Sequence, residues 1–394
     1  MTAKPCALIT LGRMPKGLDV ARALTAAGCR VIVAEPFGWH LAATSRAVAA
    51  SFQVRAPASD KAGFLQDLSD IIRREAVDLV VPVSEESSFV ACLAGSLPEG
   101  TRLLCAPEER LLALHDKAAF AVQARSLGLG VPETHPLGSA GAQDLAERQA
   151  VVVKPTHACA GSGVSFHAPG DTLPSIPGCI VQARLTGREF SSVTLAEEGR
   201  VLGTVVYEGL LMSGSVAVAF ERQTEAQAVE EWIARFVAET GHSGFIGFDF
   251  IQEPGKPPMA IECNPRITSG VHFFDPAWLA RALMDPQAAP PVVYRSQLRL
   301  QIFWQCLAEM YGAMARLNGR RYRQVMRTLF TSKDVLARWR DPWPFWLMTF
   351  TSWPILRRAL FQGMTLGEAA TCDIVWQGGE TITTAVTPAR ESAP

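Results

Sequence analysis

Asp249, Glu262 and Asn264 bring three oxygen ligands into one short apolar stretch of the chain. The stretch is predicted to form two strands, Phe248–Ile251 and Met259–Cys263, joined by a turn rich in proline and glycine. Residues two apart on a strand share a face, so Glu262 and Asn264 are neighbours, and the turn can bring Asp249 beside them. Such ligands suit a hard cation such as Mg²⁺. The alternative is a solvated acidic rim, but a charge embedded in apolar sequence is costly without a partner, which favours the metal.

Basic residues near this stretch suit a phosphate or carboxylate partner. Arg266 follows the three oxygen ligands and carries a fixed charge that suits either group. Lys154 closes the apolar strand Ala150–Pro155, and a phosphate partner explains that position; the alternative is a lysine that extends from the strand end into solvent. The small residues of the next loop, Thr156–Val164, let backbone N–H groups approach a phosphate.

Length and composition limit the classes of protein to consider. A chain of 394 residues and 42.6 kDa exceeds the usual size of a single core, so two or three domains are expected. With 48% hydrophobic and 19% charged residues the chain is globular, and its net charge of -1 gives no support for a nucleic-acid binder. The nine cysteines form no CxxC pair, so we interpret them as reduced, mostly buried thiols of a cytoplasmic protein. No secretory signal is recognised.

The first part of the chain is predicted to form an α/β unit with a parallel sheet. Apolar runs at Cys6–Leu11 and Arg30–Ala34 flank a helix at Leu18–Ala27, which is the order of a βαβ unit. A further helix and strand follow at Phe64–Glu75 and Val77–Val83. The loop after that last strand lies at the edge where open α/β sheets bind ligands. No GxGxxG fingerprint of a dinucleotide-binding oxidoreductase is present.

The central part alternates predicted strands and helices around a polar linker that ends near Gln149. The predicted helices are Leu111–Leu127 and Thr224–Thr240, and the further strands are Cys179–Leu185, Glu189–Leu195 and Arg200–Glu208. Arg222 lies just before the second helix.

The character of the sequence changes after about Pro290. Helices are predicted at Leu298–Leu317 and Arg321–Phe330, followed by an uncharged, Trp-rich run at Pro342–Leu356. The run is shorter than the ~20 residues of a membrane-spanning helix, and prolines interrupt it, so no span is predicted. Packing against the body of the protein is expected. The alternative is an interfacial anchor, since Trp residues and a flanking Arg357 are typical of one.

Taken in order, these pieces resemble the ATP-grasp superfamily, and within it the branch of carboxylate–amine ligases similar to carbamoyl-phosphate synthase and biotin carboxylase. The resemblance covers roughly residues 5 to 295. It implies a Rossmann-like domain at residues 1–110 and an ATP-grasp domain of two α+β subdomains at 111–295. Residues 296–394 are then a helical or irregular extension of unknown role, whose Trp-rich part we expect to pack on the ATP-grasp domain.

The resemblance also implies roles for individual residues. Lys117, in the run His115–Lys117, and Lys154 match lysines that contact phosphates. In Val181–Glu189, which is similar to the hinge of the family, Ala183 and Leu185 would give main-chain bonds to adenine, Gln182 would face the adenine edge and Glu189 would hold the ribose hydroxyls. Asp249, Glu262 and Asn264 match the magnesium ligands, where Mn²⁺ is also suitable. Arg266 and Arg222 match basic residues that meet the γ-phosphate or the substrate carboxylate.

The reaction implied by the resemblance begins when a carboxylate attacks the γ-phosphate of ATP, giving an acyl phosphate and ADP. An amine then displaces phosphate, and Arg266, Arg222 and Lys154 would supply the catalytic charges. The expected partners are small carboxylates and amines, and no nucleic acid is expected. No transmembrane span is predicted, and weak peripheral contact with a membrane is the alternative. A homodimer is compatible with the sequence. His157 and His272 are interpreted as structural, and the alternative is that one of them acts as a base toward the amine. A nucleotide-binding protein with a regulatory or scaffold role is the alternative function.

Overall fold

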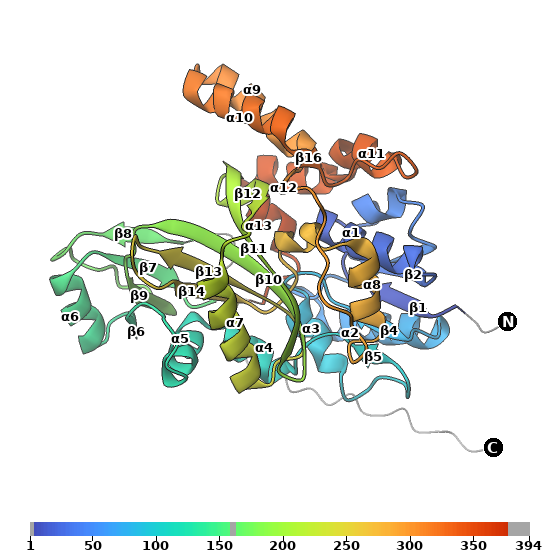
Figure 1. Cartoon of the computed structure of the whole chain (residues 1–394), viewed down its shortest axis with the longest axis horizontal. Coiled ribbons are helices and arrows are strands. Elements are labelled where there is room, and N and C mark those ends of the chain that lie inside the picture. The colour runs from blue at the N-terminus through green and yellow to red at the C-terminus, as the bar shows by residue number, and fades with distance from the viewer. Residues whose placement is uncertain (1–3, 158–162, 377–394) are drawn as a thin grey trace.

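A parallel sheet of five strands forms the N-terminal part of the computed structural model, which describes residues 4–157 and 163–376 (Figure 1). Its strands are β1 (Cys6–Ile9), β2 (Arg30–Glu35), β3 (Ala50–Gln53), β4 (Leu79–Val81) and β5 (Arg102–Leu103), in the order β3-β2-β1-β4-β5. All four strand pairs are parallel, as the βαβ pattern predicted. The connecting helical segments are α1 (Pro15–Ala26), η1 (Leu41–Thr44), α2 (Lys61–Arg74), α3 (Ser87–Val90) and η2 (Ala91–Leu93).

A smaller antiparallel sheet follows, and it contains elements that the sequence did not reveal. Its strands are β6 (Thr134–Pro136), β7 (Val151–Pro155), β8 (Ser165–His167) and β9 (Cys179–Ala183), in the order β6-β9-β7-β8. The expected polar linker before Gln149 contains β6 and the helix α6 (Ala140–Arg148). Ser139 caps this helix by accepting a hydrogen bond from the Ala142 backbone N–H at 3.2 Å. The helix buries only three small or apolar residues, too few to make its period visible.

The predicted helix Leu111–Leu127 is two helices. They are α4 (Glu108–His115) and α5 (Lys117–Ser126). The side chain of Asp116 accepts hydrogen bonds from the first free N–H groups of α5, both at 2.8 Å, and so starts a new helix at Lys117. This cap places Lys117 at the N-terminus of α5.

The third and largest sheet has seven strands. They are β10 (Arg188–Glu197), β11 (Arg200–Ser213), β12 (Val216–Arg222), β13 (Gly244–Gln252), β14 (Met259–Asn264), β15 (Arg299–Gln301) and β16 (Lys333–Asp334), in the order β14-β13-β10-β11-β12-β15-β16. The strand β12 was not predicted, and Leu298–Gln301, predicted as helix, includes β15. The helix α7 (Gln227–Thr240) covers one face through stacked and edge-on rings of Trp232, Phe236 and Phe248.

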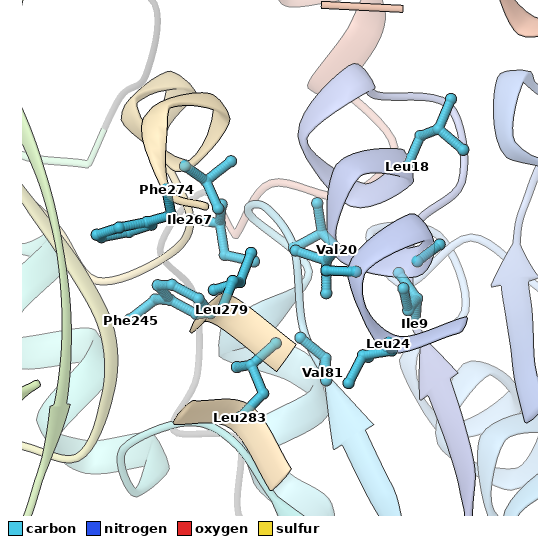
Figure 2. Packing of buried hydrophobic residues seen from close by; sticks show 14 of the residues in the cluster. Ile9, Leu18, Val20, Leu24, Val81, Phe245, Ile267, Phe274, Leu279 and Leu283 are labelled. Atoms are coloured by element: carbon cyan, nitrogen blue, oxygen red, sulfur yellow. The ribbon is translucent and has the colours of Figure 1, made fainter. Parts of the chain in front are cut away.

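One hydrophobic cluster joins the parallel sheet to the large sheet. Figure 2 shows Val20 of α1 facing Ile267 and Leu279, of which Leu279 belongs to the helix α8 (Pro276–Met284), whereas Leu18 points to the other side of α1. The labelled members of the cluster are Ile9, Leu18, Val20, Leu24, Val81, Phe245, Ile267, Phe274, Leu279 and Leu283. Because each is buried, separating the two parts would expose a continuous apolar surface. The loops at the carboxyl edge of the parallel sheet are therefore held against the end of β14.

The C-terminal part is helical. Its helices are α9 (Phe303–Ala315), α10 (Gly319–Thr331), α11 (Trp343–Thr351), α12 (Trp353–Gln362) and α13 (Leu366–Thr371). Pro344 and Pro354 lie in the first turns of α11 and α12, so these prolines begin two helices and do not interrupt one. In Figure 1, α9 and α10 extend away from the rest of the molecule. Within residues 4–157 and 163–376, no helix is long and apolar enough to cross a membrane.

The Trp-rich region packs on the N-terminal part, so the predicted packing on the ATP-grasp domain is wrong for α11. Just before α11, Asp341 accepts hydrogen bonds from Arg22 at 2.9 Å and from Ser45 at 2.6 Å. Near the end of the described chain, Asp373 binds Arg13. Met348 of α11 is also buried in the cluster that contains Leu41 and Ala42, so these polar contacts add to apolar packing.

The cysteines agree with the sequence analysis as far as the structure describes them. All eight that it describes are free thiols, and five of them are buried. Cys159 lies outside the described residues.

Candidate active site

Asp249, Glu262 and Asn264 lie together on one face at the edge of the large sheet. Strands β13 and β14 pair antiparallel, with Asp249 directly opposite Glu262 and a β-bulge after Asp249. The side-chain Nδ2 of Asn264 donates a hydrogen bond to Asp249 Oδ2 at 2.9 Å. The predicted proximity of the three residues is therefore confirmed.

The negative charges of Asp249 and Glu262 oppose each other, and the positive charge of Arg266 offsets only part of the penalty on Asp249. Burial, and then the negative charge of Glu262, raise the pKa of Asp249 to about 6, although Ser191 Oγ donates to its Oδ1 at 2.6 Å. A divalent cation would remove this penalty, and two carboxylates with a carboxamide are ligands that Mg²⁺ accepts. In the described parts of the chain, no group of three or more His, Cys, Asp or Glu side chains could hold a metal ion, so this mixed set is the candidate.

Of two buried lysines beside β14, one lies near the Glu262 carboxylate and the other binds the backbone next to it. The Nζ of Lys117 lies 3.5 Å from Glu262 Oε1, and its side chain is 5% exposed. Lys154, at the end of β7, donates from Nζ to the Ile261 carbonyl at 3.0 Å and is 6% exposed. Burial lowers the pKa of Lys154 to about 8, while the charge of Glu262 opposes that shift. A lysine that extends into solvent is thus excluded for Lys154.

Arg266 connects these carboxylates to the N-terminal part. Its Nη2 lies 2.7 Å from Oε1 of Glu85 and donates to Asn264 Oδ1 at 3.0 Å. Glu85 belongs to the loop after β4, at the carboxyl edge of the parallel sheet. Burial alone would raise the pKa of Glu85, but the charges of Arg266, His115 and Lys16 and the hydrogen bond from Arg266 together outweigh it and lower that pKa. The sequence marked this loop as a ligand-binding edge without singling out Glu85.

Arg222 shares the face of the two carboxylates but lies farther away. Five consecutive partners run straight across the sheet, in the order Glu262, Asp249, Ser191, Tyr207 and Arg222. Directly opposite residues of antiparallel strands point to the same face, and three strand spacings separate Arg222 from Asp249, or about 14 Å. The guanidinium of Arg222 lies over the Tyr294 ring, 4.5 Å from its centroid. The structure therefore does not bring Arg222 into contact with the carboxylates.

A cleft of about 430 Å³ lies beside the segment that resembles the family hinge. Ala183 and Leu185, predicted to give main-chain bonds to adenine, are among the residues that line it. Gln182 does not face it, because its buried Nε2 donates to Thr134 Oγ1 at 3.0 Å; the predicted orientation toward adenine is wrong. Glu189 is exposed on β10, opposite Ile251, and is not among the residues that line the cleft. The cleft is lined by Pro132, Glu133, Gln149, Ala183, Arg184, Leu185, Ile251, Glu253, Lys256, Pro257 and Met259.

The two histidines near the site have protein partners. The Nδ1 of His272 lies 2.8 Å from Asp19 Oδ2 in a buried pair, which agrees with a structural histidine. His157 lies 3.5 Å from Asp116 and meets Trp376 edge-on, with ring centroids 4.9 Å apart. It begins the small-residue loop expected to approach a phosphate, and residues 158–162 of that loop lie outside the described residues.

Comparison with known proteins identifies the central part of the chain. Residues 114–270 match the model of a family described as an ATP-grasp domain. The chain contains an ATP-grasp domain. The structure accordingly combines a Rossmann-like N-terminal domain, an ATP-grasp domain of two α+β subdomains and a helical C-terminal extension. A search of curated proteins found no match.

Solved structures show the same fold at low sequence identity. The biotin carboxylase domain of *Hydrogenobacter thermophilus* 2-oxoglutarate carboxylase, solved with MgADP, ADP and bicarbonate, has a TM-score of 0.56 at 14% identity, over 71% of this chain and 69% of that one. The ADP complex of *Staphylococcus aureus* N5-carboxyaminoimidazole synthetase gives 0.58 at 12%, over 75% and 81%. An L-amino acid ligase from *Bacillus licheniformis* gives 0.54 at 16%, over 74% and 78%.

Proposed function

We propose that this ATP-grasp protein is an ATP-dependent ligase that phosphorylates a small carboxylate and couples the acyl phosphate to an amine, releasing ADP and phosphate. The observation that carries the proposal is the convergence of two carboxylates, a carboxamide and two buried lysines on one face of the large sheet. Phosphoryl transfer depends mainly on positioning and charge neutralisation, and these groups can supply both. The structural neighbours described with MgADP or ADP support the same assignment.

The nucleotide would lie between the smaller sheet and the large sheet. We assign the adenine to the cleft lined by Ala183 and Leu185, and the phosphates to Lys117 and Lys154. Glu189 remains our candidate for the ribose, and it would have to turn toward the cleft. Asp249, Glu262 and Asn264 would hold Mg²⁺ or Mn²⁺, which when bound neutralises charge on the phosphates.

The carboxylate substrate would lie near Arg266, beside the candidate metal ligands. That guanidinium already binds the Glu85 carboxylate at 2.7 Å, so it can bind a substrate carboxylate in the same geometry. The substrate oxygen would attack the γ-phosphate while Lys154 balances the developing charge, and the amine would then displace phosphate from the acyl group. Arg222 remains a candidate contact for the substrate, although it lies on the same face about three strand spacings from Asp249.

The proposed substrate, nucleotide and metal contacts are divided among the domains expected from the sequence. Residues 1–110 would supply the substrate-facing loop with Glu85, and residues 111–295 the nucleotide and metal ligands. No side chain from the described part of residues 296–394 is assigned a role in the reaction. Their strands β15 and β16 nevertheless extend the large sheet beside β12, so the extension supports the catalytic face.

The test is release of products from ATP in the presence of pooled amino acids and small carboxylic acids. Mg²⁺-dependent release of ADP and phosphate that requires one of the acids is expected, and mass spectrometry would identify the amide. Release of AMP and pyrophosphate would overturn the proposal, because it indicates adenylation of the carboxylate. Tight ATP binding without turnover under any combination would favour the nucleotide-binding regulatory role.

A further inference from the structure

A stripe of exposed aromatic residues runs along α11 and α12. Trp343, Trp346, Phe350 and Trp353 are 52%, 58%, 61% and 56% exposed, and we call these four residues the aromatic stripe. Their intervals of three, four and three residues keep them on one side of a helix. The backbone of Ser352, which joins the two helices, is itself helical, so the spacing continues through the junction.

The opposite side of α11 is anchored, so the exposure of the stripe is a property of the folded protein. Pro344, Met348 and Thr351 are the buried residues of this helix. Trp304 of α9 donates from Nε1 to the Phe345 carbonyl at 2.6 Å, and its ring lies 6.4 Å from that of Trp346. The helix therefore cannot rotate to bury its stripe without breaking these contacts. Large exposed apolar patches of this kind mark interaction sites.

The same region carries a strong positive charge. Residues 303–362 contain ten Lys or Arg and three Asp or Glu, whereas the whole chain contains 37 and 38. The rest of the protein is thus acidic, and the excess of basic residues is concentrated in these helices. Arg320, Arg323 and Arg327 of α10 have the spacing of one helix face and are all exposed. None of the three forms an ion pair with another residue in the described ranges.

The three acidic residues of the region do not neutralise this face. Glu309 binds Arg321 at 2.9 Å, and Asp341 binds Arg22. Asp334 accepts a hydrogen bond from the Phe303 backbone N–H at 2.7 Å. Each of the three acidic side chains therefore has a partner within the protein, and the charge that this region presents to solvent is basic.

We propose that the α10–α12 region docks on the surface of an anionic membrane, with the aromatic stripe in the interfacial layer and the arginines of α10 against lipid headgroups. Trp and Phe on an apolar face together with Arg are the combination that interfacial helices use. Charge selects this occupant over a second copy of the chain, because two copies would bring two strongly basic surfaces together. The proposal does not depend on the ligase reaction.

Co-sedimentation of the full chain with vesicles tests the proposal. The parent is expected to pellet with mixed phosphatidylcholine and phosphatidylglycerol vesicles, to pellet much less with phosphatidylcholine alone, and to be partly released by salt. The pair Arg323→Gln and Arg327→Gln should weaken binding by about fivefold for each arginine. The pair Trp343→Ser and Phe350→Ser should weaken it by about tenfold or more.

Matched controls separate this surface from general effects. Arg73→Gln with Arg281→Gln removes two exposed charges elsewhere, and Trp39→Ser removes a Trp that is 54% exposed in the N-terminal part; both variants should bind vesicles like the parent. Thermal unfolding confirms that every variant folds. Absence of parental pelleting with anionic vesicles would overturn the proposal. A parent dimer in sedimentation equilibrium that becomes a monomer in the Trp343 and Phe350 variant would also overturn it, by making a second copy the occupant.

Discussion

Asp249→Asn should make the metal-free protein more stable at neutral pH while removing a ligand from the candidate metal site. Burial and the opposite carboxylate of Glu262 raise the pKa of Asp249 from 3.8 to about 6. Between these values the folded protein binds more protons at this group than the unfolded chain does, so the free energy of unfolding falls as the pH rises. Above pH 6 the ionised group costs about 3 kcal/mol, at 1.36 kcal/mol per pH unit.

Asparagine keeps the shape of the side chain and removes that charge. Ser191 Oγ can still donate to it, but the hydrogen bond from Asn264 Nδ2, at 2.9 Å, loses its acceptor at a cost of about 1–2 kcal/mol. This loss does not vary with pH, whereas the penalty on the parental carboxylate does. The stability difference between the proteins should therefore shift by about 2 kcal/mol in favour of the variant between pH 4.5 and pH 7.

Urea unfolding in EDTA at several pH values measures this shift. Asp70→Asn, which removes an exposed carboxylate on α2, is the control and should show little change with pH. In a second arm, Mg²⁺ with ATP should raise the unfolding temperature of the parent more than that of Asp249→Asn, since a ligand stabilises only the state that binds it. Parallel pH profiles for the parent and the Asp249 variant would refute the idea of an uncompensated charge.

Three further changes test the site and the fold. Lys154→Met should weaken ATP binding in calorimetry by roughly 10- to 100-fold, as loss of one charge-assisted contact does, and unchanged affinity would remove Lys154 from the nucleotide site. Asp373→Ala deprives buried Arg13 of bonds at 2.7 and 3.0 Å and should lower stability by about 3 kcal/mol, while Asp373→Asn, which keeps an acceptor for Arg13, should lower it less in denaturant unfolding. Burial lowers the pKa of His242 to about 4, so stability from this residue falls by about 3 kcal/mol as the pH drops from 6.5 to 4, and His242→Leu should abolish that part of the acid sensitivity.

The candidate metal ligands could be predicted because their geometry is local. Alternation along a strand and one hairpin turn bring Glu262, Asn264 and Asp249 to one face, and the register of β13 with β14 agrees. The sequence also favoured a partner for Lys154 over exposure to solvent, because the lysine ends a β-branched strand, and the structure shows that it is buried. In both cases the information lies within a few residues of the site.

Long-range partners and short elements could not be predicted in the same way. Glu85 and Arg266 meet at 2.7 Å although 181 positions separate them, and no spacing rule encodes that ion pair. Gln182 appeared free to face a ligand, but Thr134 of the unpredicted strand β6 binds it. The prolines of the Trp-rich run were interpreted as interruptions, yet a proline in the first turn of a helix loses no intrahelical hydrogen bond.

A buried carboxylate on α1 explains how the C-terminal extension can influence the site without entering it. Asp19 lies 2.8 Å from His272 Nδ1, 3.1 Å from Arg295 Nη2 and 3.6 Å from Arg338 Nη2. Burial alone would raise the pKa of Asp19, but these partners lower it well below its ordinary range, so the residue is a fixed negative charge. His272 belongs to η3 (Ser269–Phe273), which begins three residues after Arg266. Because Asp19 holds η3, the linker after α8 and the C-terminal part at one point, the position of Arg266 depends on contacts from all three regions of the chain.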